Sequence, residues 1–362
     1  MGSEKIWKIA IVGLGSIADE SYMPQMHRNK KAEVVACCDI MPERAADFSK
    51  KHGIAKTYVS VDDLLAYEDF DILMDTASIP AHYEINKKAL KAGKHLYSQK
   101  PISLTVGEAT DLIETAKASK VKFAASPIHA LRPDIQEGQR LIKQGILGKV
   151  NLVRAINHHG GPEYFQYRIN DPSWFHEPGA GALYDLAVHS LHQVTALLGP
   201  AKSVSCMAVI SEPRRTVRSG NFNGKLIESN KLYDNYMINL DFGEGTVANV
   251  MSGYCVKATT TPSLEVYGEC GSIIYTREHG RSMSVYIDEP ERKIRGWLEQ
   301  MPQERPGFDF YQCYCITDLI QAIEEDRDPI LRPEHARHVI DIMCNVEQAA
   351  ADGTVHRLET VF

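Results

Sequence analysis

Two short patterns supply groups that could move protons. Asp185 and His189 are four residues apart in GAGALYDLAVHSLH, within a helical stretch at residues 182–198, so both side chains leave the same helix face. A carboxylate at this spacing can orient an imidazole and stabilise its charged form, as a general base requires. Lys100 precedes Pro101, which disfavours helical geometry for the lysine and holds it extended at a strand end. The catalytic candidates are therefore an acid and histidine pair and a lysine.

The first expected strand and the turn after it predict the cofactor that these groups work with. Residues 8–12 form a short apolar run, typical of a strand buried on both faces, and lead into GLGSIA, a GxGxxA turn. In such a turn Gly13 permits the tight bend, Gly15 lets a pyrophosphate approach the backbone, and the following helix offers amide donors to the phosphates. A second apolar run ends in Asp39, whose carboxylate suits ribose hydroxyls and repels a 2′-phosphate. We therefore predict a dinucleotide site for NAD rather than NADP.

The order of the expected elements divides the chain in two. Strands and helices alternate through residues 8–125, the pattern of a doubly wound parallel sheet. After residue 132 longer alternating strands predominate, which predicts an open, mainly antiparallel sheet in an α/β domain. The polar segment 214–230 predicts a long loop. We assign residues 1–126 to a Rossmann dinucleotide-binding domain and residues 127–362 to a domain for substrate binding and oligomerisation.

Composition narrows the class of protein. With 362 residues and 44% hydrophobic side chains, the chain can bury a core in each of two domains. The net charge of −7 argues against nucleic acid and anionic membranes as partners, and no apolar run approaches the roughly 20 residues that span a bilayer. Eight irregularly spaced cysteines resemble neither a disulfide framework nor a zinc site, and the N-terminus lacks the apolar core of a signal peptide. These features predict a cytoplasmic protein with reduced thiols that acts on a small solute.

With these motifs in view, the chain resembles the family of glucose-fructose oxidoreductase and inositol dehydrogenase (the Gfo/Idh/MocA family). The resemblance extends over GLGSIA, TASIPAHYEINKKALKAGKHLYSQKPIS, DPSWFHEPGAGALYDLAVHSLH and QAAADGTVHRL. It implies an N-terminal Rossmann domain, a C-terminal α/β domain on an open sheet, and an active site lined by Lys100, Asp185 and His189. Three residues depart from the family pattern: Gln99 replaces the glutamate before the lysine, Phe175 replaces an arginine, and Ala187 replaces a glycine.

Further residues are expected to contact ligands, some from the motifs and some from the resemblance. Those expected to bind NAD are Gly13, Gly15, Ser16, Ile17, Asp39, Ala77, Ser78, Pro80, His82, Gln99, Lys100 and Trp174. Those expected to bind substrate are Lys100, His129, Arg132, Asn157, His158, Tyr164, His176, Asp185 and His189. Such polar and aromatic groups suit a polyhydroxylated ring, because sugars are held by hydrogen bonds to hydroxyls and by aromatic faces. No metal ligand set is assigned.

The resemblance implies reversible hydride transfer between NAD and a ring secondary alcohol of a sugar, glycoside or cyclitol. In this hypothesis His189 removes the hydroxyl proton, Asp185 orients His189, and Lys100 stabilises the developing alkoxide. Oxidation at C3 of a glucoside recurs in the family and favours a glucoside substrate. An open sheet face that needs covering predicts a homodimer or homotetramer formed through the C-terminal sheet.

Other interpretations stay open. The chain could be an inositol dehydrogenase, or a glycosidase in which NAD is regenerated each cycle while the glycoside is transiently oxidised and its aglycone eliminated. A metal site is a further alternative, because His192 continues the helix face of Asp185 and His189. A catalytically silent binding protein is another, because Gln99 departs from the family motif.

Overall fold

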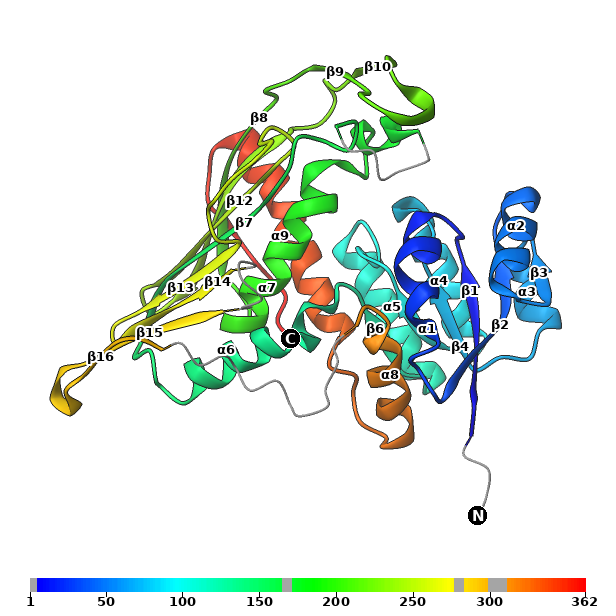
Figure 1. Cartoon of the computed structure of the whole chain (residues 1–362), viewed down its shortest axis with the longest axis horizontal. Coiled ribbons are helices and arrows are strands. Elements are labelled where there is room, and N and C mark those ends of the chain that lie inside the picture. The colour runs from blue at the N-terminus through cyan, green and yellow to red at the C-terminus, as the bar shows by residue number, and fades with distance from the viewer. Residues whose placement is uncertain (1–4, 165–170, 277–282, 299–310) are drawn as a thin grey trace. The chain divides into compact units, whose positions relative to one another are not determined.

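The computed structural model describes residues 5–164, 171–276, 283–298 and 311–362. The chain divides into two units, one comprising Met1–Leu131 and Phe310–Ile340 and the other Arg132–Asp309 and Asp341–Phe362. Figure 1 draws the first unit mainly in blue to cyan, with helix α8 in orange, and the second mainly in green to yellow.

The first unit is built on a sheet that contains six strands among the described residues, in the order β3-β2-β1-β4-β5-β6. They are β1 (Trp7–Val12), β2 (Ala32–Cys38), β3 (Lys56–Tyr58), β4 (Ile72–Asp75), β5 (His95–Ser98) and β6 (Phe123–Ala125). Every neighbouring pair runs parallel. Strand β4 is buried along its whole length, as expected for a sheet covered on both faces. Strand order and direction confirm the predicted Rossmann fold.

Helices connect these strands, and most lie where the sequence predicts them. The connecting and terminal elements are the π-helix η1 (Ile17–Tyr22), α1 (Met23–Met26), α2 (Pro42–His52), α3 (Val61–Tyr67), η2 (Ile79–Ala81), α4 (His82–Lys91), α5 (Val106–Ser119), η3 (Ile128–Leu131) and α8 (Tyr314–Glu324). Helix α5 starts at a capping box, in which the Thr105 side chain accepts from the Glu108 amide and the Glu108 carboxylate accepts from the Thr105 amide.

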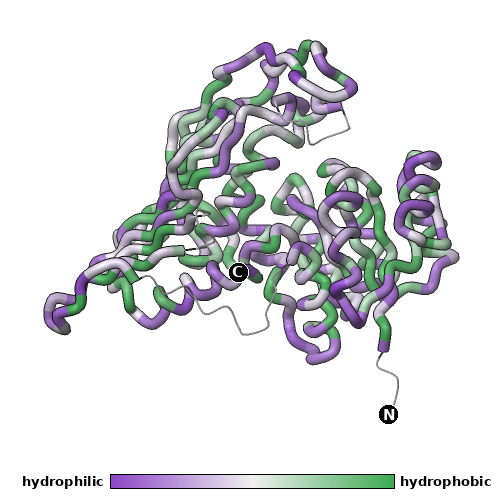
Figure 2. Tube along the Cα trace, viewed as in Figure 1, coloured by the Kyte–Doolittle hydropathy of each residue, from purple (hydrophilic) through white to green (hydrophobic). Residues whose placement is uncertain are grey.

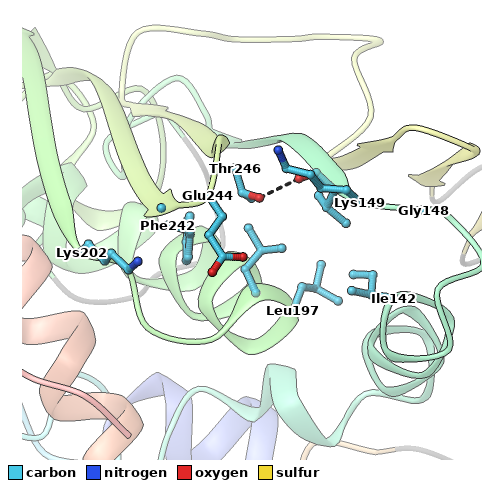
Figure 3. A pocket seen from close by; sticks show the side chains of 11 residues that line it. Ile142, Gly148, Lys149, Leu197, Lys202, Phe242, Glu244 and Thr246 are labelled. Carbon is cyan, nitrogen blue, oxygen red and sulfur yellow. Dashed lines mark hydrogen bonds between the residues drawn. The ribbon is translucent and has the colours of Figure 1, made fainter.

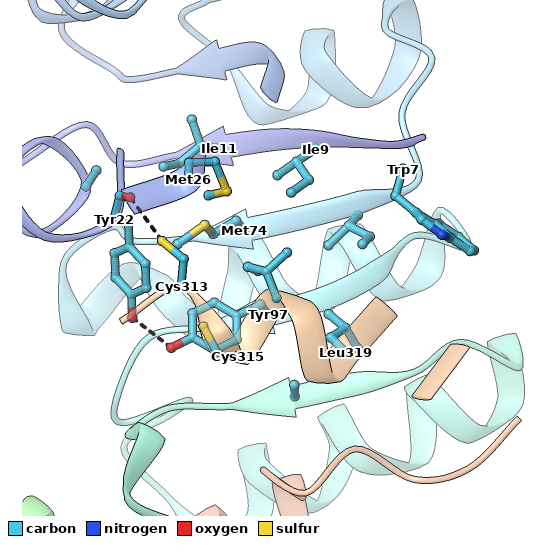
Figure 4. Packing of buried hydrophobic residues seen from close by; sticks show 14 of the residues in the cluster. Trp7, Ile9, Ile11, Tyr22, Met26, Met74, Tyr97, Cys313, Cys315 and Leu319 are labelled. Atoms are coloured by element: carbon cyan, nitrogen blue, oxygen red, sulfur yellow. Dashed lines mark hydrogen bonds between the residues drawn. The ribbon is translucent and has the colours of Figure 1, made fainter. Parts of the chain in front are cut away.

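The core of the first unit includes residues from the far end of the chain (Figure 4). Tyr22, Met74 and Tyr97 pack with Cys313 and Cys315, and α8 contacts β5 and β6. A single boundary after residue 126 therefore does not describe this division, because Phe310–Ile340 belongs to the first unit.

The second unit is built on a sheet in which the described residues form nine strands, in the order β16-β15-β14-β13-β7-β12-β11-β8-β17. They are β7 (Val150–His158), β8 (Ser203–Val209), β11 (Asn235–Gly243), β12 (Thr246–Gly253), β13 (Leu264–Gly268), β14 (Gly271–Tyr275), β15 (Ser284–Glu289), β16 (Ile294–Leu298) and β17 (His356–Arg357). Only the β7 and β12 pair runs parallel among these described strands, which confirms the mainly antiparallel sheet. Buried and exposed positions alternate along β11, where Tyr236, Ile238 and Leu240 are buried. Figure 2 shows hydrophobic and hydrophilic residues interspersed along the strands of this sheet.

The predicted long loop at residues 214–230 is wrong at both ends. Strands β9 (Arg214–Thr216) and β10 (Leu226–Glu228) pair there as an antiparallel hairpin. Its polar composition concealed the pairing, because the central residues Arg215 and Ile227 are buried while their neighbours are exposed.

The second unit also contains helices, and two consecutive ones carry the predicted acid and histidine pair. They are α6 (Pro133–Lys143), η4 (Pro172–His176), the π-helix η5 (Leu183–Ala187), α7 (Val188–Leu198), η6 (Gly220–Phe222), η8 (Pro290–Arg292) and α9 (Pro333–Asp352), which continues from the first unit. The expected helix at residues 182–198 thus begins as π-helix and continues as α-helix. All eight cysteines are free thiols. In the described part of the chain, every helix is too short or too polar to cross a membrane.

Candidate active site

The turn after β1 can accept only glycine at its first position. Gly13 has φ +84°, and a Cβ built there would lie 2.3 Å from the Ala77 Cα and 2.4 Å from the Ala77 nitrogen. The carbonyl oxygens of Val12 and Gly13 both accept from the Thr76 hydroxyl, which joins the turn to the end of β4. The turn and the end of β4 are therefore packed backbone against backbone, and the glycine is a steric requirement.

The next residues leave room and a donor for a phosphate group. A Cβ on Gly15 would meet nothing within 4 Å, so its backbone is open to a close approach. The Ser16 hydroxyl is buried without a hydrogen-bond partner among the described residues, which is unusual for a buried polar atom. Ile17, the first residue of η1, is exposed. An open glycine beside an unsatisfied hydroxyl fits a dinucleotide pyrophosphate.

Asp39 directly follows β2 and is held by backbone amides. Its Oδ2 accepts from the Leu14 amide at 2.9 Å, and its Oδ1 accepts from the Met41 amide at 2.9 Å. The side chain is 5% exposed, and one Arg44 nitrogen lies 3.5 Å from Oδ2. The carboxylate is thus fixed next to the glycine turn, where an adenosine ribose would need acceptors. Arg44, which the sequence analysis did not assign to the site, is an additional neighbour of this carboxylate.

The loop after β4 is shaped by a buried acid that the sequence reasoning missed. Asp75 accepts from the Ala77 amide at 2.9 Å and lies 2.7 Å from the Nδ1 of His82, with both side chains buried. His82 therefore holds the loop from inside, whereas Ser78 and Pro80 are exposed on it. A buried carboxylate at a strand end is the signal that could have revealed this pair.

Gln99 is part of a buried network at the end of β5. Its amide nitrogen donates to the Tyr22 hydroxyl, and its oxygen accepts from the Lys100 amide at 3.2 Å. The Tyr22 and Tyr97 hydroxyls are 2.7 Å apart (Figure 4). Gln99 is 8% exposed, whereas Lys100 is only partly buried. The glutamine at this position thus contributes a donor that a glutamate would lack.

Asp185 and His189 differ from their neighbours in the chain in solvent exposure. In the fully described stretch of residues 180–195, these two side chains are partly exposed and every other residue is buried. Asp185 lies in η5 and His189 in the first turn of α7, so the pair flanks the junction between the π-helical segment and the α-helix. Single-turn π segments recur at functional sites. Within this stretch the helix therefore exposes a carboxylate and an imidazole and keeps its other side chains buried.

Two residues from the sheet support this helix. The Asn157 side-chain amide donates to the Leu186 carbonyl at 3.0 Å, and the Tyr254 hydroxyl donates to Asp185 Oδ2 at 3.1 Å. Asn157 lies on β7 and Tyr254 directly after β12. Asn157, expected to bind substrate, is therefore committed to the helix backbone, and Tyr254 is a site residue that the sequence did not suggest.

The remaining expected ligands lie in varied environments. Arg132 pairs with Asp134, its Nε lying 3.0 Å from the carboxylate. His158 is partly buried, and burial lowers its pKa. Tyr164 lies under the Arg218 guanidinium, 5.0 Å from its ring centre. The others are Trp174, which is exposed, His129, which is partly exposed, and His176 and His192, which are buried.

His176 belongs to a buried ionic cluster, which consists of Glu163, His176, Arg215 and Asp234. Arg215 donates to Glu163 and to Asp234 at 2.8 Å each, and His176 Nε2 lies 3.2 Å from Glu163. Burial opposes ionisation, yet hydrogen bonds from His176 and Arg215 lower the pKa of Glu163. The pKa of Asp234 is lowered against burial by two backbone amides and Arg215. His176 is thus engaged inside the fold, and Arg215 was hidden from sequence reasoning by the expected loop.

One cavity of about 450 Å³ lies away from these groups (Figure 3). The end of α7, including Leu197, lines this cavity. At about 1.5 Å per residue, Leu197 lies roughly 18 Å along the helix from Asp185. Lys149, Lys202 and Glu244 surround its apolar floor. Within the described ranges, no three His, Cys, Asp or Glu side chains are placed to hold a metal ion, so the metal alternative receives no support from the geometry.

Models of two domains from one protein family match the chain. The NAD-binding Rossmann fold of the oxidoreductase family matches residues 7–126, and the GFO/IDH/MocA C-terminal domain matches residues 135–274. The chain belongs to the GFO/IDH/MocA family of oxidoreductases. Family membership confirms the predicted resemblance, the enzyme class and the NAD cofactor. The glycine turn, the open Gly15 backbone and the unsatisfied Ser16 hydroxyl fit that cofactor.

Named relatives act on sugars. The chain is 28% identical over 346 residues to D-glucoside 3-dehydrogenase of Escherichia coli (strain K12), and the aligned residues cover 90% of this chain and 97% of that protein. It is 25% identical over 360 residues to 1,5-anhydro-D-fructose reductase of Ensifer adhaerens, covering 97% and 98%. The structure of a levoglucosan dehydrogenase in complex with NADH and levoglucosan has a TM-score of 0.82 at 17% identity, covering 98% of this chain and 100% of that chain. The structural likeness shows the shared fold.

Proposed function

We propose that this oxidoreductase oxidises a ring secondary alcohol of a glucoside or related pyranoside with NAD, at C3 in a glucoside. The observation that carries the proposal is the pair Asp185 and His189, the two partly exposed groups in an otherwise buried stretch of residues 180–195. Similarity to D-glucoside 3-dehydrogenase over nearly the whole chain supports the glucoside and the carbon.

The proposed chemistry assigns one role to each group. When bound, NAD supplies the hydride acceptor, C4 of its nicotinamide. His189 takes the hydroxyl proton as the C–H bond breaks, so that the alcohol becomes a ketone and the imidazole carries the proton. Asp185 orients the imidazole and stabilises its protonated form, and Lys100 stabilises the developing alkoxide. The proposed cofactor contacts are Gly13, Gly15, Ser16, Ile17, Asp39, Ala77, Ser78, Pro80 and Trp174, with Gln99 and His82 supporting the loops.

A panel of glucosides, free sugars and inositols tests this proposal, with NAD or NADP and absorbance of the reduced cofactor as the measurement. NADH accumulation with a glucoside supports it, and oxidation at C3 would appear in the product ketone by NMR. NADH accumulation with inositols alone would indicate that the substrate is a cyclitol and not a glucoside. Release of an aglycone without net NADH would indicate a glycosidase instead. No turnover across the panel would refute an enzyme of this substrate class.

We also propose that the chain forms a homodimer or homotetramer through the outer face of the sheet in its second unit. Met207, Met237, Met251 and Ile156 lie side by side across β8, β11, β12 and β7. Met207 is 70% exposed and Met237 is 47% exposed, so an apolar row faces outward in the single chain. Exposed apolar surface of this kind is typical of protein interfaces. Light scattering of the purified protein measures the assembly, and a monomer would contradict the proposal.

A further inference from the structure

We propose that Tyr254 positions the Asp185 carboxylate, and that the buried cluster around Arg215 holds Tyr254 in place for this task. The inference rests on the proposed role of Asp185. Its starting point is the Tyr254 hydroxyl, which donates to Asp185 Oδ2 at 3.1 Å from a side chain that is 1% exposed. A partly exposed carboxylate has several rotamers available, and a fixed phenol donor favours one of them.

Tyr254 is restrained at its backbone and on its ring. Its amide donates to the Asp234 carbonyl at 2.8 Å, and its carbonyl accepts from Arg215 at 3.1 Å. The His159 ring stacks on it at 5.2 Å between ring centres with an interplanar angle of 11°, and His176 contacts it edge-on at 5.8 Å. The phenol therefore reaches Asp185 from a base that cannot easily move.

The cluster around Arg215 provides that base. The Arg215 and Asp234 side chains are 1% and 2% exposed, and Glu163 is 5% exposed on the other side of the guanidinium. Two carboxylates fix the planar guanidinium, and the nitrogen that donates to Glu163 also donates to the Tyr254 carbonyl. Arg215 lies in β9 of the β9 and β10 hairpin. The hairpin is therefore linked to Asp185 through Tyr254, which contacts Arg215 with its carbonyl and Asp185 with its hydroxyl.

The phenol is a suitable partner because it adds a donor without a second charge. A cation at this place would compete with the imidazole for the carboxylate, whereas a neutral hydroxyl leaves the negative charge available to His189. Tyr254 makes no proposed contact with the substrate. It is a positioning residue that acts through Asp185.

The test is a double-mutant cycle between Tyr254→Phe and Asp185→Asn, measured as kcat with NAD and the best substrate of the panel. Hydrogen bonds to charged groups correspond to roughly tenfold to hundredfold effects, so we expect kcat of Tyr254→Phe to fall by about tenfold or more. The Kd for NADH should stay unchanged. In the Asp185→Asn background the second substitution should change kcat by less than about twofold, because its target is already lost.

Tyr275→Phe is the matched control. Tyr275 is also buried in the second unit, and its hydroxyl has no hydrogen-bond partner among the described residues, so kcat should stay at the wild-type value. The Tm of Tyr254→Phe should lie within about 5 °C of the control, as expected for one lost hydrogen bond. If Tyr254→Phe does not fold, Arg215→Lys takes its place and should likewise lower kcat only while Asp185 is present.

The outcomes separate this inference from the proposed function. If Asp185→Asn abolishes turnover but Tyr254→Phe keeps wild-type kcat, the positioning role is wrong and the proposed function stands. If the fold-reductions of kcat from the two substitutions multiply in the double variant, Tyr254 does not act through Asp185 and the inference is again overturned. If Asp185→Asn itself keeps wild-type kcat, the proposed role of Asp185 fails and this inference fails with it.

Discussion

The two glycines of the GxGxxA turn should fail in different ways when each is replaced by alanine. At Gly13 the added methyl would lie 2.3 Å from the Ala77 Cα and would also have to adopt φ +84°. The left-handed backbone costs an alanine about 1–2 kcal/mol, and forcing extra atoms into packed surroundings costs about 1–3 kcal/mol more. Because the opposing atoms belong to the backbone, they cannot rotate away. We expect Gly13→Ala to lose about 2–5 kcal/mol of unfolding free energy.

Gly15→Ala provides the contrast. Nothing lies within 4 Å of the position its methyl would take, so folding should be unaffected. The same methyl would stand where the backbone must approach a pyrophosphate, so we expect the Kd for NADH to rise by about tenfold or more, equivalent to about 1.4 kcal/mol. One substitution thus removes stability and the other removes cofactor affinity.

Thermal unfolding followed by circular dichroism and NADH titration followed by fluorescence measure the two effects. For a unit of this size about 1 kcal/mol shifts Tm by roughly 2–4 °C, so Gly13→Ala should melt about 4–20 °C below wild type. Gly15→Ala should melt within about 2 °C of wild type without ligand and gain less Tm from added NADH. A Gly13→Ala protein with wild-type Tm, or a Gly15→Ala protein with wild-type NADH affinity, would refute the reasoning.

Three further outcomes follow from the site and the sheet. His189→Ala should lower kcat by about 10²–10⁴-fold while the Kd for NADH stays unchanged, and near-native turnover would rule out His189 as the base. Arg215→Met should lose about 3–5 kcal/mol at neutral pH in urea unfolding, because it leaves Glu163 and Asp234 buried without their cation. Both carboxyls have lowered pKa values in the fold, so their stabilisation is present above the ordinary pKa of about 4 and lost as the pH falls below it. The wild type should therefore lose stability below about pH 4, and Arg215→Met should lack much of that loss; equal acid sensitivity in both would contradict the cluster's role. Met237→Glu should convert the proposed oligomer to monomer in light scattering with little change in Tm, whereas Tyr67→Glu, at a 78% exposed site of the other unit, should leave the assembly intact.

Several features followed from the sequence because they are encoded by neighbouring residues. The GxGxxA turn, the alternation of strands and helices and the spacing of Asp185 and His189 all depend on short-range periodicity. The family follows from several such motifs found together. The locally encoded pattern also indicated the mainly antiparallel second sheet, since alternation along each strand shows which face is buried.

What only the tertiary structure decided are contacts between residues far apart in the chain. Tyr254 meets Asp185 across 69 positions, and Glu163 meets Arg215 across 52. Their partners cannot be inferred from spacing, and Arg215 sits in a polar segment that resembles a loop. In the same way, Gln99 finds its acceptor on Tyr22, 77 residues away, so the structure explains the amide where the sequence offered only a departure from a motif. The physical reason is that a buried polar group must be hydrogen-bonded by whichever group the fold places beside it. The residues next to it in the sequence do not specify which distant residue that will be.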